Sequence, residues 1–454
     1  MNPDNYFRDR DIDSMDKPVN QVFDMQADKA QTARRQGHGQ RRLVQPGGSI
    51  GAAPFQGDKM VRLFGEDLTR ADIRRRSGSL GAFGGVRLME LTDGLERGIR
   101  MLEFRTGTGL RFTVLVDRAM DVAEVEYQGR SIAWHGPSGF RHPGLHEHDA
   151  EGGFSWGRSF SGFLVTCGLD HTLGPQEVPA DSYNYPGVKT VRHGLHGRVS
   201  VIPAKLTGYG ERWEGDRCML WAEGQVRQAT TFGENLTLYR RIEADLGGNE
   251  IRLTDRVVNE GFLPTPHMFF YHINLGHPLL AQGSRYLAPI TDVVWAAHTD
   301  RYKAQGVGYQ TLPAPQPKFV EQVWQHETAA DAGGEVPVAV VNDRLGLGVE
   351  VTFRKDQLPC LYEWQHFQEG GYALGIEPST HHVLGNTAAR QRGEMIWLGE
   401  HEARSYDARF RVLDGAAEIA ASAARIRAIA VQPADDFPEP SGRFRPLTGR
   451  RQPA

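Results

Sequence analysis

Short stretches in which apolar and polar residues alternate run through most of this chain. A repeat of two places successive side chains on opposite faces of an extended strand. More than ten such stretches lie between residues 58 and 413, and no helical pattern of about 12 residues separates them, as it does in folds that alternate strands with helices. The chain is therefore predicted to be all-β, with antiparallel strands packed as a sandwich. Typical stretches are LRFTVLVD, LTLYRRIEAD, NEIRLTDRVVN, HMFFYHINLG and GEMIWLG.

The glycine content agrees with many short strands. The chain holds 53 glycines in 454 residues, well above the usual ~7%. They are scattered between the alternating stretches and form no repeat. Gly247-Gly248-Asn249, for example, separates two consecutive stretches, as the tight turn of a β-hairpin requires. We therefore expect hairpins that connect neighbouring strands.

The ends of the chain differ from this central region. Residues 1–57 place a run of aspartates before a basic stretch without acidic residues, and a Gly-rich stretch follows. Low hydrophobicity and charge in blocks predict an N-terminal extension or linker that is partly disordered. Residues 414–430 are rich in alanine, with Ile419 and Ile426 near helical spacing, and predict a short C-terminal helix. Five prolines in residues 431–454 predict a Pro-rich tail.

Charge and cysteine content exclude several classes of protein. The 52 Lys and Arg residues and 56 Asp and Glu residues give a net charge of −4, which is too balanced for a general nucleic-acid-binding surface. Cys167, Cys218 and Cys360 lie far apart, which excludes a disulfide scaffold and the usual thiolate zinc site and favours a cytoplasmic location. No apolar run approaches about 18 residues, and the N-terminus lacks the features of a secretory signal. We expect neither a nucleic acid nor a membrane as partner.

Three segments carry residue types suited to catalysis or to sugar binding. His193 and His196 lie three positions apart in the turn VRHGLHGR, where glycines leave the backbone open to a ligand. His272 and Asn274 share one face of the strand FFYHINL. Glu377 ends the apolar strand YALGIEP, where a carboxylate must be paired, shifted in pKa or exposed. A histidine and an amide on one face of a sheet suit a polyol-binding site.

Each of these residues also has a structural interpretation. His272 can be a core histidine that is hydrogen-bonded to a carbonyl, as most buried polar groups are. His193 and His196 can be solvated residues of a turn, because glycine-flanked histidines suit turns. Glu377 can form an ion pair with an arginine such as Arg390. The pattern of residues alone leaves these alternatives open.

The three segments, in this order, resemble the aldose 1-epimerase, or galactose mutarotase, superfamily. Leu195-His196-Gly197 is similar to the Leu-His-Gly turn of that family. His272 with Asn274-Leu275 is similar to its strand histidine before an Asn-Leu pair, and Glu377 to the glutamate at the end of a late strand. VDRAMDV, GFLVTCGLDH, GLHGRVS and YHINLG resemble an epimerase-like subfamily known only as a domain of unknown function. The resemblance covers about residues 58–413 and implies a galactose mutarotase-like antiparallel β-supersandwich with few short helices, which binds a free sugar on its open face.

The resemblance implies an isomerase that interconverts the anomers of an aldose or a sugar acid. Opening a pyranose needs a base at the anomeric hydroxyl and an acid at the ring oxygen. The resemblance implies that His272 is the acid and Glu377 the base, with His196 as a hydrogen-bonding partner of the sugar. No metal and no cofactor are needed, and no nucleotide-binding glycine motif follows a strand. The expected partner is a small carbohydrate, and the sequence predicts no oligomeric state.

Further side chains are candidates for substrate binding, each with a structural alternative. The guanidinium of Arg118 can hold two hydroxyls or a carboxylate, or it can belong to an ion-pair cluster of a hairpin. Asp170, in the stretch CGLDH, can bind substrate or serve structure. Trp364 can be a platform for a sugar ring or a core residue. Asn274 and His193 complete the set of expected substrate-binding residues.

Two other functions fit the same residues. A histidine cluster with a carboxylate can bind zinc or manganese and give a metal-dependent isomerase or lyase for a keto sugar. The residues of that cluster would be His193, His196, His272, His277 and Glu377. Alternatively, the chain can be a non-catalytic carbohydrate-binding module that keeps the pocket, since fold does not imply function.

Overall fold

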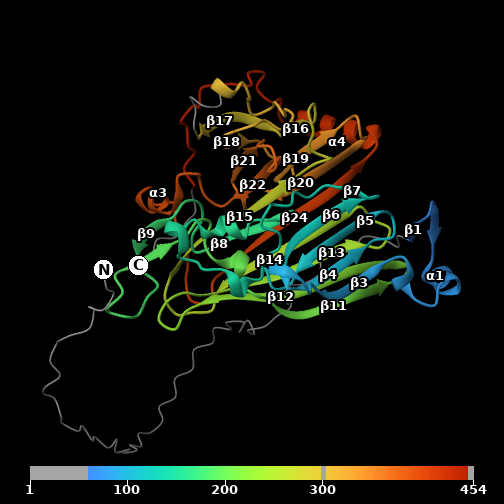
Figure 1. The fold of residues 1–454 in the computed structure, drawn as a ribbon, viewed down its shortest axis with the longest axis horizontal. Helices are drawn as coiled ribbons and strands as arrows, with labels where there is room; N and C mark the ends of the chain where they lie inside the picture. The colour runs from blue at the N-terminus through green and yellow to red at the C-terminus, as the bar shows by residue number, and fades with distance from the viewer. Residues whose placement is uncertain (1–59, 298–302, 448–454) are drawn as a thin grey trace, which may run out of the picture. The chain divides into compact units, whose positions relative to one another are not determined.

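Two large antiparallel sheets form most of the structure. The structure is a computed structural model and describes residues 60–297 and 303–447. All described residues belong to the unit Ile50–Ala454. Figure 1 shows the order of the strands in space. The eight-stranded sheet runs β11 (Lys205–Glu214), β12 (Arg217–Ala229), β13 (Asn235–Asp245), β14 (Glu250–Asn259), β24 (Ala403–Asp414), β20 (Leu347–Arg354), β19 (Glu335–Asn342) and β16 (Arg285–Leu287).

The second large sheet contains the strands that carry His272 and Glu377, the expected acid–base residues. Strand β8 also pairs with β15 of this sheet, so β15 has neighbours on both sides. The order is β17 (Ile290–Ala296), β18 (Gln322–Thr328), β21 (Cys360–His366), β22 (Ala373–Ser379), β15 (Thr265–Leu275) and β23 (Ile396–Leu398), with β8 (Leu164–Leu169) beside β15.

A third sheet and a few short elements complete the described part. All the strand pairings within the sheets are antiparallel. The third sheet runs β3 (Gly85–Glu90), β4 (Arg100–Arg105), β5 (Leu110–Leu115), β6 (Asp121–Tyr127) and β7 (Arg130–Ser131), and two hairpins pair β1 (Val61–Leu63) with β2 (Glu66–Leu68) and β9 (Gln176–Pro179) with β10 (Thr190–His193). Helices of the described part include α1 (Arg70–Arg76), α3 (Gly385–Gln391) and α4 (Ala416–Ile429), with 3-10 turns η1 (Leu80–Ala82), η2 (Gly94–Glu96), η3 (Pro143–Leu145), η4 (Ala150–Gly153), η5 (Ser155–Arg158) and η6 (Val199–Val201).

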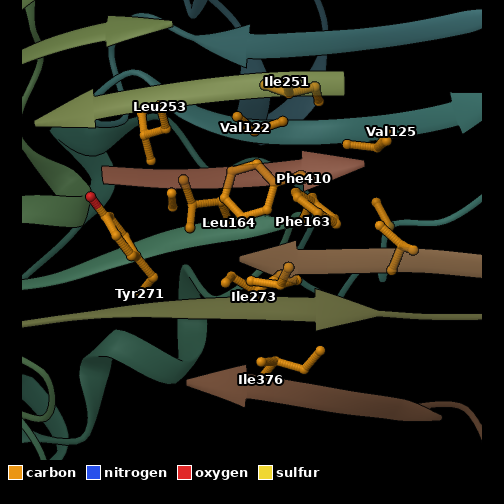
Figure 2. Close-up of a cluster of buried hydrophobic side chains, with 14 of the residues drawn as sticks. Val122, Val125, Phe163, Leu164, Ile251, Leu253, Tyr271, Ile273, Ile376 and Phe410 are labelled. Atoms are coloured by element: carbon orange, nitrogen blue, oxygen red, sulfur yellow. The ribbon is translucent and has the colours of Figure 1, made fainter. Parts of the chain in front are cut away.

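The main hydrophobic core lies between the sheets. Figure 2 shows Ile251 and Phe410 of the eight-stranded sheet, Val122 of the third sheet and Ile273 and Ile376 of the second sheet around one interior. Each of these side chains is at most 2% exposed. The strands supply them at alternate positions, so the period-two pattern in the sequence marks the inward faces. The antiparallel all-β sandwich predicted from that pattern is confirmed.

Strand β15 is buried along its whole length. Each of its eleven residues, TPHMFFYHINL, is buried, so both faces of the strand are covered. Phe269, Tyr271 and Ile273 point into the main core. Phe270 belongs to a second, smaller cluster on the other face, and alternation places His272 on that same face.

Arg240 crosses the sandwich and fixes β15 against four other strands. Its guanidinium is 0% exposed and donates hydrogen bonds to Asp255, to Asp121 and to the Thr166 hydroxyl, at 2.6–2.8 Å. The Tyr271 hydroxyl donates to the same Asp255 carboxylate at 2.8 Å. A buried charge is tolerated only when it is paired and hydrogen-bonded, so this network fixes how β13, β14, β6, β8 and β15 meet.

The structure describes much of the C-terminal end of the chain but not residues 1–57. Residues 1–57, expected to be an extension, lie outside the described residues. Helix α4 occupies the alanine-rich segment. Residues 431–447, expected to form a tail, lie against the second sheet: the backbone N–H groups of Ser441 and Gly442 donate to carbonyls of β17 at 2.9 and 3.1 Å. Among the described residues, no helix is long and apolar enough to cross a membrane.

Replacing Arg240 with methionine should be strongly destabilising. Arg240→Met leaves the Asp255 and Asp121 carboxylates buried without their cation, which costs about 3–5 kcal/mol. Urea unfolding of the full chain measures the change. The matched control is Arg285→Met, because Arg285 forms a bidentate but exposed pair with Asp343 and should cost at most about 1 kcal/mol. Equal losses in the two variants would contradict this account.

Candidate active site

His272 and Glu377 face each other across neighbouring strands. The register of β15 and β22 pairs Ile273 with Ile376 and Asn274 with Gly375, which puts His272 directly opposite Glu377 on one face of the sheet. The His272 Nε2 atom lies 3.1 Å from the Glu377 Oε1 atom, and the two side chains are 4% and 5% exposed. The structure thus brings together two residues that are 105 positions apart in the sequence.

A glycine leaves room for this pair. A Cβ atom at Gly375 would lie 3.0 Å from Glu377 Oε1 and 3.1 Å from His272 Cε1. Both distances are closer than most Cβ contacts, so a larger residue would push the two groups apart. This explains the glycine two positions before the glutamate in the GIEP segment.

His196 reaches the pair from a tight turn. Its backbone has a φ of 58°, and Gly197 follows with a φ of 78°. A Cβ atom at Gly197 would lie 2.3 Å from the Gly168 carbonyl oxygen, so only glycine fits there. The His196 ring centre is 6.0 Å from that of His272. Its Nδ1 atom accepts a hydrogen bond from the Leu173 N–H at 3.3 Å, which leaves the proton on Nε2 as a donor.

Aromatic rings surround His272. The ring centres of Phe160, Trp364 and Trp156 lie 4.7, 5.2 and 5.9 Å from that of His272. Trp134 packs against both Phe160 and Trp364. Together with Phe270 these side chains belong to the smaller hydrophobic cluster. Trp364 was expected from sequence, whereas the rings in the stretch FSWGRSF carry no pattern that points to the site.

Burial shifts the pKa of both central groups toward their neutral forms. Loss of water lowers the pKa of His272 to about 3, which the Asn274 side chain offsets in part. Loss of water raises the pKa of Glu377 to about 8, and the nearby Glu321 carboxylate adds to the effect. Burial, followed by the charge of His272, also lowers the pKa of His196 well below its usual value. At neutral pH these shifts favour a proton on Glu377 and a neutral His272, whereas the resemblance implies His272 as the acid.

Several polar atoms beside the pair have no hydrogen-bond partner among the described residues. They are Glu377 Oε1, His272 Nδ1 and Asn274 Oδ1, all buried. The amide nitrogen of Asn274 donates to the carbonyls of Gly162 and His272 at 3.0 and 3.2 Å. Asn274 therefore holds the backbone of this strand and directs only its oxygen toward the site. Buried atoms of this kind can bond to a polar ligand or to an ordered water.

Three other sequence candidates, Arg118, His193 and Asp170, lie elsewhere. Arg118 donates to the carbonyl oxygens of Ser200, Arg141 and Ser159 at 2.6–3.1 Å, so its guanidinium joins backbone segments instead of facing the site. Burial lowers its pKa to about 10. His193 belongs to the same turn as His196, but its Nδ1 atom lies 3.9 Å from the Asp170 carboxylate, in a different polar cluster.

Glu321 is a residue of the site that the sequence did not suggest. Its carboxylate accepts a hydrogen bond from the Trp364 indole N–H at 2.9 Å. Glu321 is exposed, so it lies at the rim while Glu377 lies inside. A single glutamate just before a strand is common in any sequence, so no pattern could have identified it.

The described histidines do not assemble a metal centre. Among residues 60–297 and 303–447, no group of three or more His, Cys, Asp or Glu side chains is arranged to hold a metal ion. His277, required by the metal-dependent alternative, is exposed, and His193 lies with Asp170. The five residues of that alternative therefore do not converge on one point.

The chain is similar to one protein family and to several solved structures. A protein family described as "Domain of unknown function (DUF4432)" matches residues 96–412, whereas no curated protein matches the chain. A solved structure from Klebsiella pneumoniae, described as a "putative aldose 1-epimerase", is 25% identical with a TM-score of 0.69, over 76% of this chain and 87% of that one. A galactose mutarotase-like protein from Clostridium acetobutylicum is 12% identical with a TM-score of 0.50, over 72% of this chain and 98% of that one. The expected mutarotase-like fold is confirmed.

Removing the Glu377 carboxyl should stabilise the protein at alkaline pH. The pKa of this carboxyl is about 8 in the folded chain and about 4.3 in an unfolded one. The folded state therefore keeps a proton that the unfolded state releases, and the stability that Glu377 contributes falls as pH rises through this range. Glutamine does not ionise, so Glu377→Gln should raise Tm relative to the parent at pH 9 and much less at pH 5. The exposed control Glu400→Gln should change Tm little at either pH; a Glu377→Gln deficit that grows with pH would contradict the assigned burial.

Proposed function

The chain belongs to the family described as Domain of unknown function (DUF4432), and from that premise we propose that it is an aldose 1-epimerase-like isomerase. It would interconvert the anomers of a free sugar or sugar acid, with His272 and Glu377 as the general acid–base pair. The observation that carries the proposal is the 3.1 Å approach of these two buried side chains. The mutarotase-like fold supports a carbohydrate as the substrate.

The reaction requires one transferable proton shared by the His272 imidazole and the Glu377 carboxyl. In ring opening, His272 takes the proton of the anomeric hydroxyl, and the lone pair of that oxygen forms the C1 carbonyl. The bond between C1 and the ring oxygen breaks, and the ring oxygen takes the proton of Glu377. After rotation about the C1–C2 bond, the reverse transfers close the ring from the other face of the carbonyl. The pair begins and ends with one proton, so no net acid or base is consumed.

The surroundings suit a sugar whose anomeric and ring oxygens lie against these two groups. The His196 Nε2–H can donate to a sugar oxygen, because its tautomer is fixed by the Leu173 N–H. The rings of Trp364 and Phe160 beside His272 provide apolar groups that suit the C–H bonds of a pyranose. His272 and Glu377 are nearly inaccessible to solvent, so a sugar reaches them only when neighbouring aromatic side chains shift. Water is then excluded from the reacting atoms, which strengthens the proton transfers.

Loss of either group should abolish most of the activity. Glu377→Gln and His272→Asn should each slow anomer interconversion by about 10² to 10⁴, the usual contribution of one acid or base. The measurement is the approach to anomeric equilibrium by NMR from a single anomer. Exhaustive chelation should leave the rate of the parent unchanged, since side-chain proton transfer needs no Lewis acid.

The matched control is a second buried pair on the opposite face of the same sheet. The His326 Nε2 atom lies 2.9 Å from the Glu363 Oε2 atom, and both side chains are 0% exposed. Glu363→Gln repeats the substitution in an equally buried carboxyl away from the site and should keep the parental rate. Full activity in both site variants would remove His272 and Glu377 from the mechanism. Loss on chelation, restored by zinc or manganese, would favour the metal-dependent alternative.

The pH profile should follow the proton held by the pair. Below a pH of about 3, His272 is also protonated and the pair lacks a base; above about 8, Glu377 is ionised and the pair lacks an acid. We therefore expect kcat/KM to be flat near neutrality and to fall about tenfold per pH unit on the alkaline side, with a midpoint near 8. A profile that rises with pH through 8 would show that the active form carries an ionised Glu377.

A further inference from the structure

A second group of buried polar atoms, without hydrogen-bond partners in the described part of the chain, surrounds Asp170. Most buried polar groups in proteins are hydrogen-bonded, so a cluster of exceptions needs an explanation. Asp170, His193 and Glu234 are at most 4% exposed. The atoms concerned are His193 Nδ1, Arg198 Nη1, Glu234 Oε2 and Arg390 Nη2.

The distances within this cluster leave room for a bridging atom. The Asp170 Oδ2 atom lies 3.9 Å from His193 Nδ1 and 3.9 Å from Arg198 Nη1. Both distances are too long for a direct hydrogen bond. The other carboxylate oxygen, Oδ1, accepts a hydrogen bond from Gln228 Nε2 at 2.7 Å, which holds Asp170 in place. One oxygen atom lying between Asp170 Oδ2, His193 Nδ1 and Arg198 Nη1 could bond to all three.

The charges select the chemistry of that atom. Asp170 and Glu234 disfavour an anion, and burial together with Asp170 raises the pKa of Glu234. Arg198 and Arg390 disfavour a metal cation. Unused donors and unused acceptors stand side by side, and a hydroxyl group both accepts and donates. The cluster is therefore complementary to hydroxyl groups.

The loops next to the cluster carry an exposed aromatic pair. Tyr185 and Phe232 are 50% and 53% exposed, and their rings stack with centres 5.0 Å apart. The Asn184 N–H donates to the Phe232 carbonyl at 2.8 Å, which joins the two loops that carry them. Phe232 is two positions from Glu234, whose charge acts on Tyr183 in the loop of Tyr185. A flat aromatic surface beside hydroxyl-binding groups is the combination that holds a sugar ring.

We propose that the cluster of Asp170, His193, Arg198, Glu234 and Arg390, with the Tyr185–Phe232 pair, is a second carbohydrate-binding site. Its ligand is a neutral polyol or sugar unit with neighbouring hydroxyls. It is separate from the His272–Glu377 pair: His193 and His196 leave the same turn, but only His196 contacts that pair. The proposal does not depend on the isomerase activity.

Open-chain alditols test this site directly, because they offer neighbouring hydroxyls but no anomeric carbon. Saturation-transfer NMR of the full chain with erythritol, xylitol and sorbitol should show transfer to at least one of them. Glu234→Gln replaces an unused acceptor by a donor, and Phe232→Ser removes a platform ring from the surface without disturbing a core. Each should weaken binding about tenfold or more. Glu377→Gln and the exposed control Tyr209→Ser should bind as the parent does.

Three results would overturn the proposal. One is no transfer to any of the three alditols. A second is binding that survives Glu234→Gln and Phe232→Ser but is lost in Glu377→Gln, which would place the polyol at the acid–base pair. The third comes from crystals grown with and without the bound alditol: the same ordered waters at the four unpartnered atoms in both would show that the cluster holds water only.

Discussion

A single buried cation determines how the sheets of this protein meet. Arg240 lies inside the sandwich with its donors directed at Asp121, Asp255 and Thr166, and Tyr271 completes the network. A buried guanidinium without its partners is costly, so the network favours the arrangement of strands that supplies all of them. Tyr271 precedes His272 on β15. The network that points into the core thus also fixes the strand whose other face carries the candidate site.

Strand register and close packing position the residues of the site around strand β15. Alternation turns His272 away from the core, and the pairing of β15 with β22 brings Glu377 opposite it. Glycines at 375 and 197 make space for the pair and for His196. The enclosing aromatic rings remove water, and loss of water raises the pKa of Glu377. The chemistry proposed here depends on this dry environment as much as on the identity of the residues, because in water the Glu377 carboxyl would be ionised at neutral pH and could not serve as the acid.

Sequence was informative where a local pattern has a physical cause. The period of two predicted the sandwich, and the order of His196, His272 and Glu377 predicted which residues meet. It was uninformative where long-range packing decides. Arg118 looked suited to a ligand, yet three carbonyls from distant segments occupy its donors. Glu321 and Phe160 join the site only through the fold, and the resting proton on Glu377 reflects burial that no linear pattern records.

The central claim is that Glu377 carries the proton of the pair at neutral pH. The most direct measurement is the ¹³C chemical shift of its side-chain carboxyl across pH, assigned by comparison with Glu377→Gln. The account predicts a protonated carboxyl at neutrality that titrates near pH 8. A carboxyl already ionised at neutral pH, titrating near the usual value of about 4.3, would contradict it and return the proton to His272.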